Sequence, residues 1–343
     1  MDDELVLVTG GTGFVGISCI IRLLGDGVRV RTTVRDLARA DEVRDLVRSS
    51  GADPSGVEVV AADLLHDAGW TEAVAGATHV LHVASPFPTR QPKDEDELIV
   101  PARDGALRVL RAAHDAGVRR VVQTSSFAAI GYGRPNPGRR YTEEDWTDPD
   151  GPGVTPYAKS KTLAERAAWD FIAREGGSLE LATINPVGIF GPALGADLSS
   201  SLELLRQLLN GAFPVVPNGS VGAVDVRDVA DLHVRAMRHP DAAGERFLAV
   251  SGDAITYLEL ARLLRAGLGE RARHVPTRVI PDWVVRAGAP FSRDLRLMSQ
   301  ELGRRGDASH EKATLLLGWV PRDRDESVLA SARSLVDLGL VRD

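Results

Sequence analysis

Short apolar runs alternate with longer amphipathic stretches over the first half of the chain. The runs are rich in valine and predict strands at 5–8, 28–34, 57–60, 78–83, 119–124 and 180–184. Between them, apolar residues at helical spacing predict helices at 14–24, at 41–48, from the acidic run 93–97 to about 115, and from 157 to about 173. Alternation of strands and helices is typical of an α/β fold, so we expect a Rossmann-type doubly wound parallel sheet.

The alternation weakens after residue 184. We expect a Rossmann domain at 1–184, with 223–250 returning to it, and Val224 to Asp228 as the return to the main sheet. The remaining segments, 185–222 and 251–343, predict a smaller, mostly helical substrate lobe. Its expected helices lie at 199–209, 257–268 and around 283–298.

Bulk composition excludes several functional classes. The formal net charge of -7 over 343 residues argues against a nucleic-acid or polybasic membrane partner. No apolar run approaches a membrane span, and the acidic start carries no targeting signal, so we expect a soluble cytoplasmic protein, a monomer or homodimer. Cys19 is the only cysteine and predicts a small buried thiol rather than a disulfide or metal ligand. We assign structural roles to His79 and His82 and expect no metal site.

Three glycines follow the first predicted strand and open the first predicted helix. Side chains at Gly10 or Gly13 would obstruct a dinucleotide pyrophosphate, and one at Gly16 would push the helix off the strand. Glycine triplets also occur in ordinary tight turns. Their position between a strand and a helix predicts a cofactor site here.

The end of the second predicted strand indicates which dinucleotide binds. NAD enzymes usually place an acid here, whereas this chain has Arg35, followed by Asp36 and Arg39. A guanidinium can bind a 2'-phosphate through paired hydrogen bonds, which favours NADPH/NADP+. The alternative is that these are solvated charges at a helix start, with Asp36 pairing with one arginine.

Two further strand ends supply candidate contacts. Asp63 and Leu64 follow the third strand, where Asp63 could accept from an adenine amine and Leu64 could cover the ring; helix capping by Asp63 is the alternative. Ala84 and Ser85 follow the fourth strand, and their small side chains leave room for a ligand at the edge of the sheet.

A serine, a tyrosine and a lysine predict acid–base chemistry. Tyr157 and Lys161 lie four residues apart on a predicted helix and so share one face. An adjacent ammonium lowers the pKa of a phenol toward neutrality, as a general acid requires. The Ser126 hydroxyl, at the end of the fifth strand, could fix a carbonyl oxygen beside Tyr157.

The sequence suggests candidates for the walls of the substrate pocket, each with a structural alternative. The Pro/Gly-rich segment 133–156 precedes Tyr157 and predicts one pocket wall, with a surface excursion as the alternative. For each aromatic or methionine candidate, burial in the core of the lobe is the alternative. The pocket candidates are Phe87, Phe127, Phe213, Trp283 and Met298.

Together these motifs resemble the extended short-chain dehydrogenases/reductases. The residues that carry the resemblance are 9–16, Thr124-Ser125-Ser126, Tyr157-x-x-x-Lys161 and 185–192. Within that family, four stretches are similar to the dihydroflavonol-4-reductase-like aldehyde and ketone reductases, namely 33–36, 82–87, 224–230 and 318–322. The resemblance covers nearly the whole chain.

The resemblance implies a role for each matching residue. Ser126, directly before an aromatic residue, matches the catalytic serine better than Ser125. Tyr157 would protonate the carbonyl oxygen, Lys161 would hold the nicotinamide ribose, and Arg35 would bind the 2'-phosphate with help from Arg39. The other positions implied to lie along the cofactor are Thr12, Phe14, Val15, Asp63, Leu64, Ala84, Ser85, Thr124, Pro186 and Val187.

The chain departs from the family pattern at one place. Many members carry an asparagine in the helix before the serine strand, but 101–105 has none, so water or ribose hydroxyls would complete proton delivery. We therefore expect NADPH-dependent reduction of a small aldehyde or ketone to the alcohol. The alternatives are an NAD-dependent nucleotide-sugar epimerase or dehydratase, which usually has an acid at the Arg35 position, and a non-catalytic NADPH-binding sensor.

Overall fold

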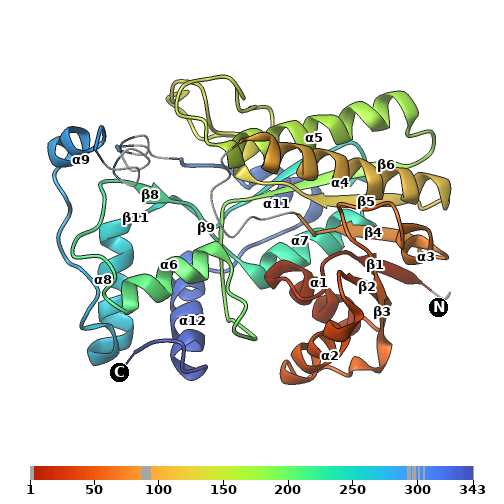
Figure 1. Ribbon diagram of the computed structural model, residues 1–343, viewed down its shortest axis with the longest axis horizontal. Helices are drawn as coiled ribbons and strands as arrows, with labels where there is room; N and C mark the ends of the chain where they lie inside the picture. Colours follow the sequence, from red (N-terminus) through yellow and green to blue (C-terminus); the bar gives the residue numbers. More distant parts are fainter. Residues whose placement is uncertain are drawn as a thin grey trace.

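The computed structural model describes residues 4–85, 94–291, 295, 299, 302–303 and 306–342. A sheet covered by helices forms one side of the molecule, and a group of helices forms the other (Figure 1). The second group includes α6 (Ser200–Leu209), α8 (Tyr257–Leu268) and α12 (Arg324–Asp337), whose apolar residues share one core. The helices predicted at 199–209 and 257–268 are thus confirmed.

The main sheet has seven strands, and every neighbouring pair runs parallel. In spatial order they are β10 (Arg246–Ala249), β6 (Glu180–Pro186), β5 (Arg120–Thr124), β4 (His79–His82), β1 (Leu5–Val8), β2 (Arg29–Val34) and β3 (Val57–Ala61). The chain runs from β1 outward to β3 and then crosses back to β4. This order confirms the Rossmann-type doubly wound sheet, in which ligands bind outside the carboxyl ends of the strands at the crossing point.

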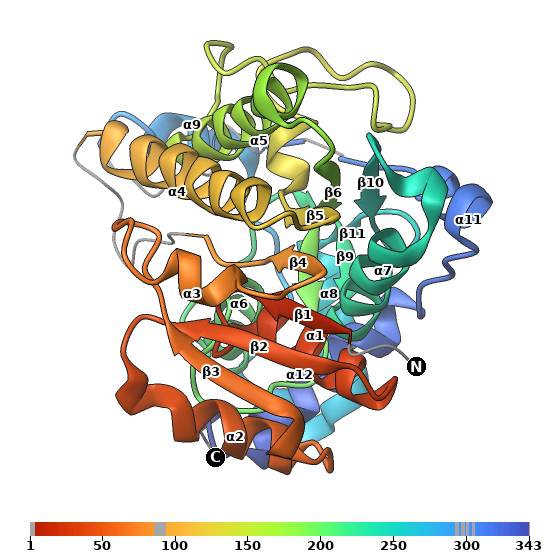
Figure 2. The same cartoon turned by 90° about the vertical axis from the view of Figure 1, so that its right-hand side faces the viewer.

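Helices cover both faces of this sheet (Figure 2). One face carries α1 (Phe14–Gly25), α2 (Ala40–Ser49), α7 (Val226–Arg238) and α11 (Glu311–Leu317). The opposite face carries α3 (Trp70–Val74), α4 (Asp96–Asp115) and α5 (Pro156–Glu175). Short 3-10 turns are η1 (Leu37–Arg39), η2 (Pro54–Gly56), η3 (Phe127–Ala129), η4 (Pro240–Ala242) and η5 (Gly269–Ala272). Among the described residues, no helix is both long and apolar enough to cross a bilayer.

The return to the main sheet differs from the expectation at Val224 to Asp228. Residues Ala223–Asp225 form β9, which pairs with β7 (Gly188–Phe190) in a separate two-stranded sheet. The next residue begins α7, because the Asp225 carboxylate caps the helix by accepting from the Arg227 N–H. The strand that rejoins the main sheet is β10. A second small sheet pairs β8 (Ser220–Val221) with β11 (Ile255–Thr256).

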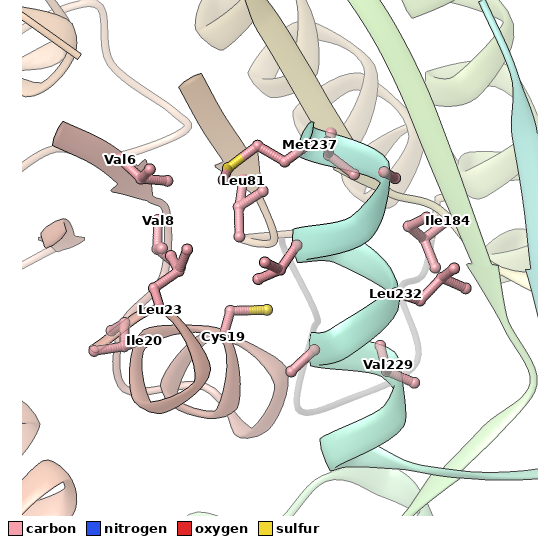
Figure 3. Packing of buried hydrophobic residues seen from close by; sticks show 14 of the residues in the cluster. Val6, Val8, Cys19, Ile20, Leu23, Leu81, Ile184, Val229, Leu232 and Met237 are labelled. Atoms are coloured by element: carbon pink, nitrogen blue, oxygen red, sulfur yellow. The ribbon is translucent and has the colours of Figure 1, made fainter. Parts of the chain in front are cut away.

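The largest core cluster fills the space between the sheet, α1 and α7. Figure 3 shows Leu23, Leu81 and Met237 converging there, with Cys19 between the two helices. The Cys19 thiol is fully buried, and burial raises its pKa, so it is an inert packing group as predicted.

A distant segment completes this same core. Trp319 is fully buried in the cluster, and its indole N–H donates to the Asp228 carbonyl at 2.9 Å. Ala313 and Leu317 of α11 join it. Part of the region expected to form the second lobe therefore packs against the main sheet.

The segment 133–156 is anchored to the residues that follow Ser126. The Thr147 hydroxyl donates to the Ala128 carbonyl at 2.8 Å and accepts from the Tyr132 N–H at 2.9 Å. Tyr141 makes a parallel bridge with Ala308. These bonds place the long connection against η3, directly beside the start of α5.

Candidate active site

The glycine turn follows β1 at the point where the strand order reverses. Gly10 has a φ of +76°, a conformation that favours glycine. A Cβ on Gly16 would lie under 3.0 Å from the Gly10 carbonyl oxygen, so a side chain there would force α1 away from the turn. This contact explains the third glycine as predicted from the sequence.

Gly11 has a structural reason that the sequence pattern did not indicate. A Cβ at Gly11 would collide with the Thr32 side chain of β2, whose hydroxyl donates to the Val8 carbonyl at 2.7 Å. The first turn of α1 has Gly13 as its N-cap, with no side-chain cap and no acidic residue. Backbone N–H groups and the helix dipole therefore face the turn, as an anionic pyrophosphate requires.

Thr9 joins the ends of β1 and β4 behind the turn. Its hydroxyl oxygen accepts from the N–H groups of Val83 and Ala84 at 3.0 and 2.9 Å and donates to His82 Nδ1 at 3.0 Å. Burial, with a smaller effect from Lys161, lowers the pKa of His82 to about 3, so its ring is neutral. Ala84 is thereby fixed against Gly10, in the glycine turn.

Arg35 and Arg39 follow β2 but differ in their contacts. Arg39 pairs with both carboxylate oxygens of Glu42, at 2.7 and 2.8 Å, and lies 3.7 Å from Asp197. Arg35 is exposed, and no carboxylate pairs with it in the part of the chain that the structure describes. Asp36 caps η1 by accepting from the Ala38 N–H at 2.9 Å, so it does not neutralise Arg35.

Asp63 and Leu64 lie beyond the end of β3. The Asp63 carboxylate accepts from the Leu65 N–H at 3.0 Å within a turn. It does not cap a helix, because the next helix, α3, begins at Trp70 with Gly69 as its N-cap. Leu64 is buried against α4, where a Cβ on Gly105 would lie 3.0 Å from the Leu64 Cβ.

Two of the three predicted catalytic side chains, Tyr157 and Ser126, are in contact at the start of α5. The helix begins after Thr155, whose hydroxyl accepts from the Ala158 N–H, and Pro156 fits its first position. Tyr157 is hydrogen-bonded to Ser126, the residue that follows β5 and Ser125. The Lys161 ammonium, one turn along, donates to the Ser85 hydroxyl at 3.0 Å.

The charge states here differ from the expectation. Burial raises the pKa of Tyr157, and the hydrogen bond with Ser126 opposes that effect only in part. Burial also lowers the pKa of Lys161 to about 8, whereas the Glu165 carboxylate raises it. The predicted lowering of the Tyr157 pKa by Lys161 is not present, because Lys161 is directed to Ser85 and the phenol is desolvated.

A polar pocket lies behind Lys161, between the carboxyl ends of β4 and β5 and the helices α4 and α5. It is lined by Leu64, His82, Ala84, Ser85, Ala102, Ala106, Gln123, Thr124, Ser125, Lys161 and Ala164. Thr124 is oriented by His233 Nε2 at 2.7 Å, and His233 Nδ1 bonds the Val229 carbonyl at 2.7 Å. Predicted cofactor contacts from three strand ends are therefore neighbours.

The aromatic pocket candidates lie in several environments. Phe127 packs edge-on against Tyr132 and Tyr141, with ring centroids 6.1 and 5.4 Å away. Phe213 is partly buried against the core of the second lobe. Trp283, at the start of α9 (Asp282–Gly288), is 72% exposed. Phe87 and Met298 lie outside the described residues.

Two buried residues next to the site had no role in the sequence predictions. Glu165 is fully buried one turn after Lys161, and Asn185 is fully buried at the end of β6. The sequence does contain a pattern that could have indicated each of them. Glu165 continues the four-residue spacing of Tyr157 and Lys161, and Asn185 directly precedes Pro186. Pro186 and Val187 follow directly, and the Val187 N–H bonds the Ala249 carbonyl of β10 at 3.2 Å.

Lys161→Met is expected to stabilise the fold, most strongly near neutral pH. Folding lowers the pKa of Lys161 from 10.5 to about 8 through burial, so the unfolded chain binds more protons between these values. Wild-type stability should therefore rise with pH across that window, whereas below it the full cost of burying the ammonium is present. The variant should gain about 2–3 kcal/mol in unfolding free energy at pH 7. Urea denaturation at pH 7 and pH 10 measures this gain; the same gain at both pH values would contradict it.

Comparison with known proteins places this geometry in a family. The model of the NAD dependent epimerase/dehydratase family matches residues 6–249, which include the glycine turn, the serine, the tyrosine and the lysine. The chain belongs to this family. The resemblance to extended short-chain dehydrogenases/reductases of the dihydroflavonol-4-reductase-like type is thus confirmed.

Curated relatives in the family carry reductase names. Cinnamoyl-CoA reductase CAD2 of Medicago truncatula is 37% identical over 267 residues, 76% of this chain and 80% of the relative. Dihydroflavonol 4-reductase of Hordeum vulgare is 35% identical over 270 residues, 76% of this chain and 74% of the relative. Among solved structures, Gre2 in complex with NADPH from Candida albicans matches with a TM-score of 0.79 and 28% identity, covering 98% of this chain and 99% of that one.

Proposed function

We propose that the protein reduces an aldehyde or ketone to the alcohol with NADPH, with Tyr157 as general acid. The observation that carries the proposal is the Tyr157–Ser126 hydrogen bond, one helical turn from Lys161. Ser126 follows β5 and the glycine turn follows β1, and these strands run parallel, so both lie toward the same edge of the sheet. Two hydroxyls that bond each other can also bond one carbonyl oxygen, which is the arrangement that carbonyl activation needs. The reductase names of the relatives support the same reaction class.

The residues of this chain fit a dinucleotide phosphate. A Cβ at Gly11 or Gly16 would collide with its neighbours, and the turn lies at a helix start without a side-chain cap, which suits a pyrophosphate. Arg35, exposed after β2, is suited to a 2'-phosphate, and Arg39 lies nearby. When bound, NADPH supplies the hydride that reduces the carbonyl carbon.

The side chains of the chain divide the remaining work. Ser126 orients the carbonyl oxygen, and Tyr157 donates a proton to it as the alcohol forms. The raised pKa of Tyr157, caused by burial, keeps the phenol protonated at neutral pH, which is the form that reduction needs. Alcohol oxidation needs the phenolate and should therefore increase as pH rises. Lys161 lies one helical turn after Tyr157 and would hold the cofactor ribose.

The substrate would lie between the sheet edge and the second lobe. Phe127 follows Ser126 directly, so it is the pocket candidate nearest the reacting carbonyl, and segment 133–156 packs beside it. We propose Phe213 as a second wall residue from the lobe formed by 185–222 and part of 251–343. The Rossmann domain, 1–184 with 223–250, would supply the cofactor site.

The nucleotide-sugar epimerases and dehydratases of the same family are the main alternative. Arg35 disfavours them, because an acid at this position would be needed to bind the ribose hydroxyls of NAD. A protein purified with tightly bound NAD and active on a nucleotide sugar would support that alternative. NADPH binding without turnover on any carbonyl would support a sensor.

The reductase proposal is tested by NADPH consumption, followed by absorbance, against a panel of aliphatic and aromatic aldehydes and ketones. Turnover of at least one carbonyl, with alcohol as product, is the expected result. The absence of turnover on the whole panel, with NADPH bound, would overturn it.

Arg35→Ser is expected to weaken use of NADPH selectively. Loss of a charged hydrogen-bond donor to the 2'-phosphate should raise the KM for NADPH about 10- to 100-fold. The KM for NADH, which lacks this phosphate, should change little. Arg39→Ser is the matched comparison and should have a smaller effect, because Glu42 already holds its guanidinium. Equal effects of Arg35→Ser on both cofactors would contradict the assignment.

A further inference from the structure

The catalytic helix carries a buried carboxylate beneath the tyrosine and the lysine. Tyr157, Lys161 and Glu165 follow one another at four-residue spacing, so they share a face of α5. Glu165 is fully buried. A carboxylate without solvent is retained only where nearby donors and charges stabilise it.

Five hydrogen-bond donors surround the Glu165 carboxylate, and they come from β10, β6, α5 and the residue that follows β5. On Oε1 it accepts from Arg246 Nε at 2.6 Å, from the Thr183 hydroxyl at 3.2 Å and from the Trp169 indole at 3.4 Å. On Oε2 it accepts from the Ser125 hydroxyl and from Asn185 Nδ2 at 2.7 Å. An ionised carboxylate only accepts hydrogen bonds, whereas a protonated one must also donate one. All the partners of Glu165 are donors, so they fit the charged form.

Two of these donors bracket Ser126. Ser125 is its chain neighbour, and Asn185 Nδ2 also donates to the Ser126 carbonyl at 3.3 Å. Glu165 therefore fixes the backbone that aims the Ser126 hydroxyl at Tyr157. On its other side, Arg246 donates to the carbonyls of Glu143 and Asp145 at 2.6 and 2.9 Å, so the same carboxylate ties segment 133–156 to the helix.

We propose that Glu165 is a positioning residue that holds Lys161 as an ammonium and holds the Ser126 turn in place for Tyr157. This inference rests on the reductase function proposed above and names a residue that acts through Ser126 and Lys161. Glu165 touches neither substrate nor cofactor in this account.

The other titratable groups around the pair do not account for the charge on Lys161. They are Tyr157 on α5, His82 on β4, Arg246 on β10 and Glu143 in segment 133–156. The pKa of His82 is lowered to about 3, so its ring is neutral except at acidic pH. A protonated His82 would repel the Lys161 ammonium and could not stabilise it. Glu165 is the group that raises the pKa of Lys161 against the effect of burial.

The decisive test is a direct titration of Lys161 in wild type, Glu165→Gln and Glu143→Gln. The chain contains only four lysines, at 93, 159, 161 and 312, so lysine labelled with carbon-13 next to the amine gives four NMR signals. Lys161→Met assigns the relevant one. Wild-type Lys161 should titrate near pH 8, and Glu165→Gln should lower its midpoint by about one pH unit.

Glu143→Gln removes another buried carboxylate, which accepts from the Leu248 N–H, and should leave the Lys161 midpoint unchanged. The titration requires no turnover, so it decides the effect on Lys161 even if no carbonyl substrate is reduced. Folded Glu165→Gln protein whose Lys161 titrates as in wild type would overturn the proposal.

Kinetics test the positioning of Ser126. Glu165→Asp keeps the charge but retracts it from Ser125 and Asn185, so kcat should fall about 10-fold or more, with the Lys161 midpoint unchanged. Ser125→Ala, a milder change, removes one link and should lower kcat with little change in NADPH affinity. If Glu165→Gln does not fold, these two variants still decide the question, because wild-type kcat in both would overturn the positioning of Ser126.

Discussion

Tyr157→Phe is expected to lower kcat/KM for carbonyl reduction by about 10²- to 10⁴-fold, the range found when a positioned general acid is removed. The substitution deletes only the hydroxyl that bonds Ser126 and leaves the ring in place. NADPH affinity should therefore change little. Stopped-flow or steady-state NADPH consumption with the best carbonyl of the panel measures the loss, and fluorescence titration measures binding.

Tyr257→Phe serves as the matched control for this experiment. Tyr257 begins α8 and packs against the core of the second lobe, away from β5 and α5. Its variant should retain the wild-type rate within about twofold, since the Tyr257 hydroxyl has no part in the proposed acid–base chemistry and contributes no transition-state contact. Wild-type turnover in Tyr157→Phe would remove the tyrosine from the mechanism, even if the protein proved to be a reductase.

Gly16→Ala is expected to abolish detectable NADPH binding and to destabilise the fold by about 1–3 kcal/mol, the usual cost of forcing atoms into a packed site. The added methyl would meet the Gly10 carbonyl, so either α1 or the turn must move. Movement of either one takes backbone N–H groups away from the pyrophosphate. Thermal denaturation with and without NADPH measures both effects in one experiment.

Gly25→Ala provides a control in the same helix. Gly25 ends α1, and a Cβ there would have no neighbour within 4 Å. Alanine is the better helix former by about 1 kcal/mol. This variant should bind NADPH normally and melt at or slightly above the wild-type temperature. Binding that survives Gly16→Ala would mean that the turn tolerates a shift of the helix and is not the phosphate cradle.

The sequence was sufficient for most of the sheet, because its strands are buried and valine-rich and the helices between them are strongly amphipathic. It failed at Val224, where an apolar pair before an aspartate indicates a strand but not the sheet to which that strand belongs. β9 pairs with β7, and this pairing depends on the direction that the chain takes after β6. The residues around Val224 do not indicate that direction. For the same reason, the return of Trp319 to the main core was not predicted.

The placement of the candidate residues was predictable where sequence spacing alone determines it, and their catalytic roles belong to the proposal above. Tyr157 and Lys161 share a helix face, and the Ser126 side chain meets Tyr157 as the motif requires. The charge states were not predictable, because desolvation depends on neighbours far apart in the sequence. Lys161 is directed to Ser85, and Glu165 is paired with Arg246, 81 residues away.

The packing of Trp319 determines when this protein can finish folding. Trp319 packs in the core beside α7, and its indole N–H donates to the Asp228 carbonyl, so residues 1–250 without it lack part of their main core. Nascent chains would expose that apolar surface until α11 and the tryptophan are synthesised. The nucleotide-binding half thus reaches its final stability late in translation, together with the lobe that follows it.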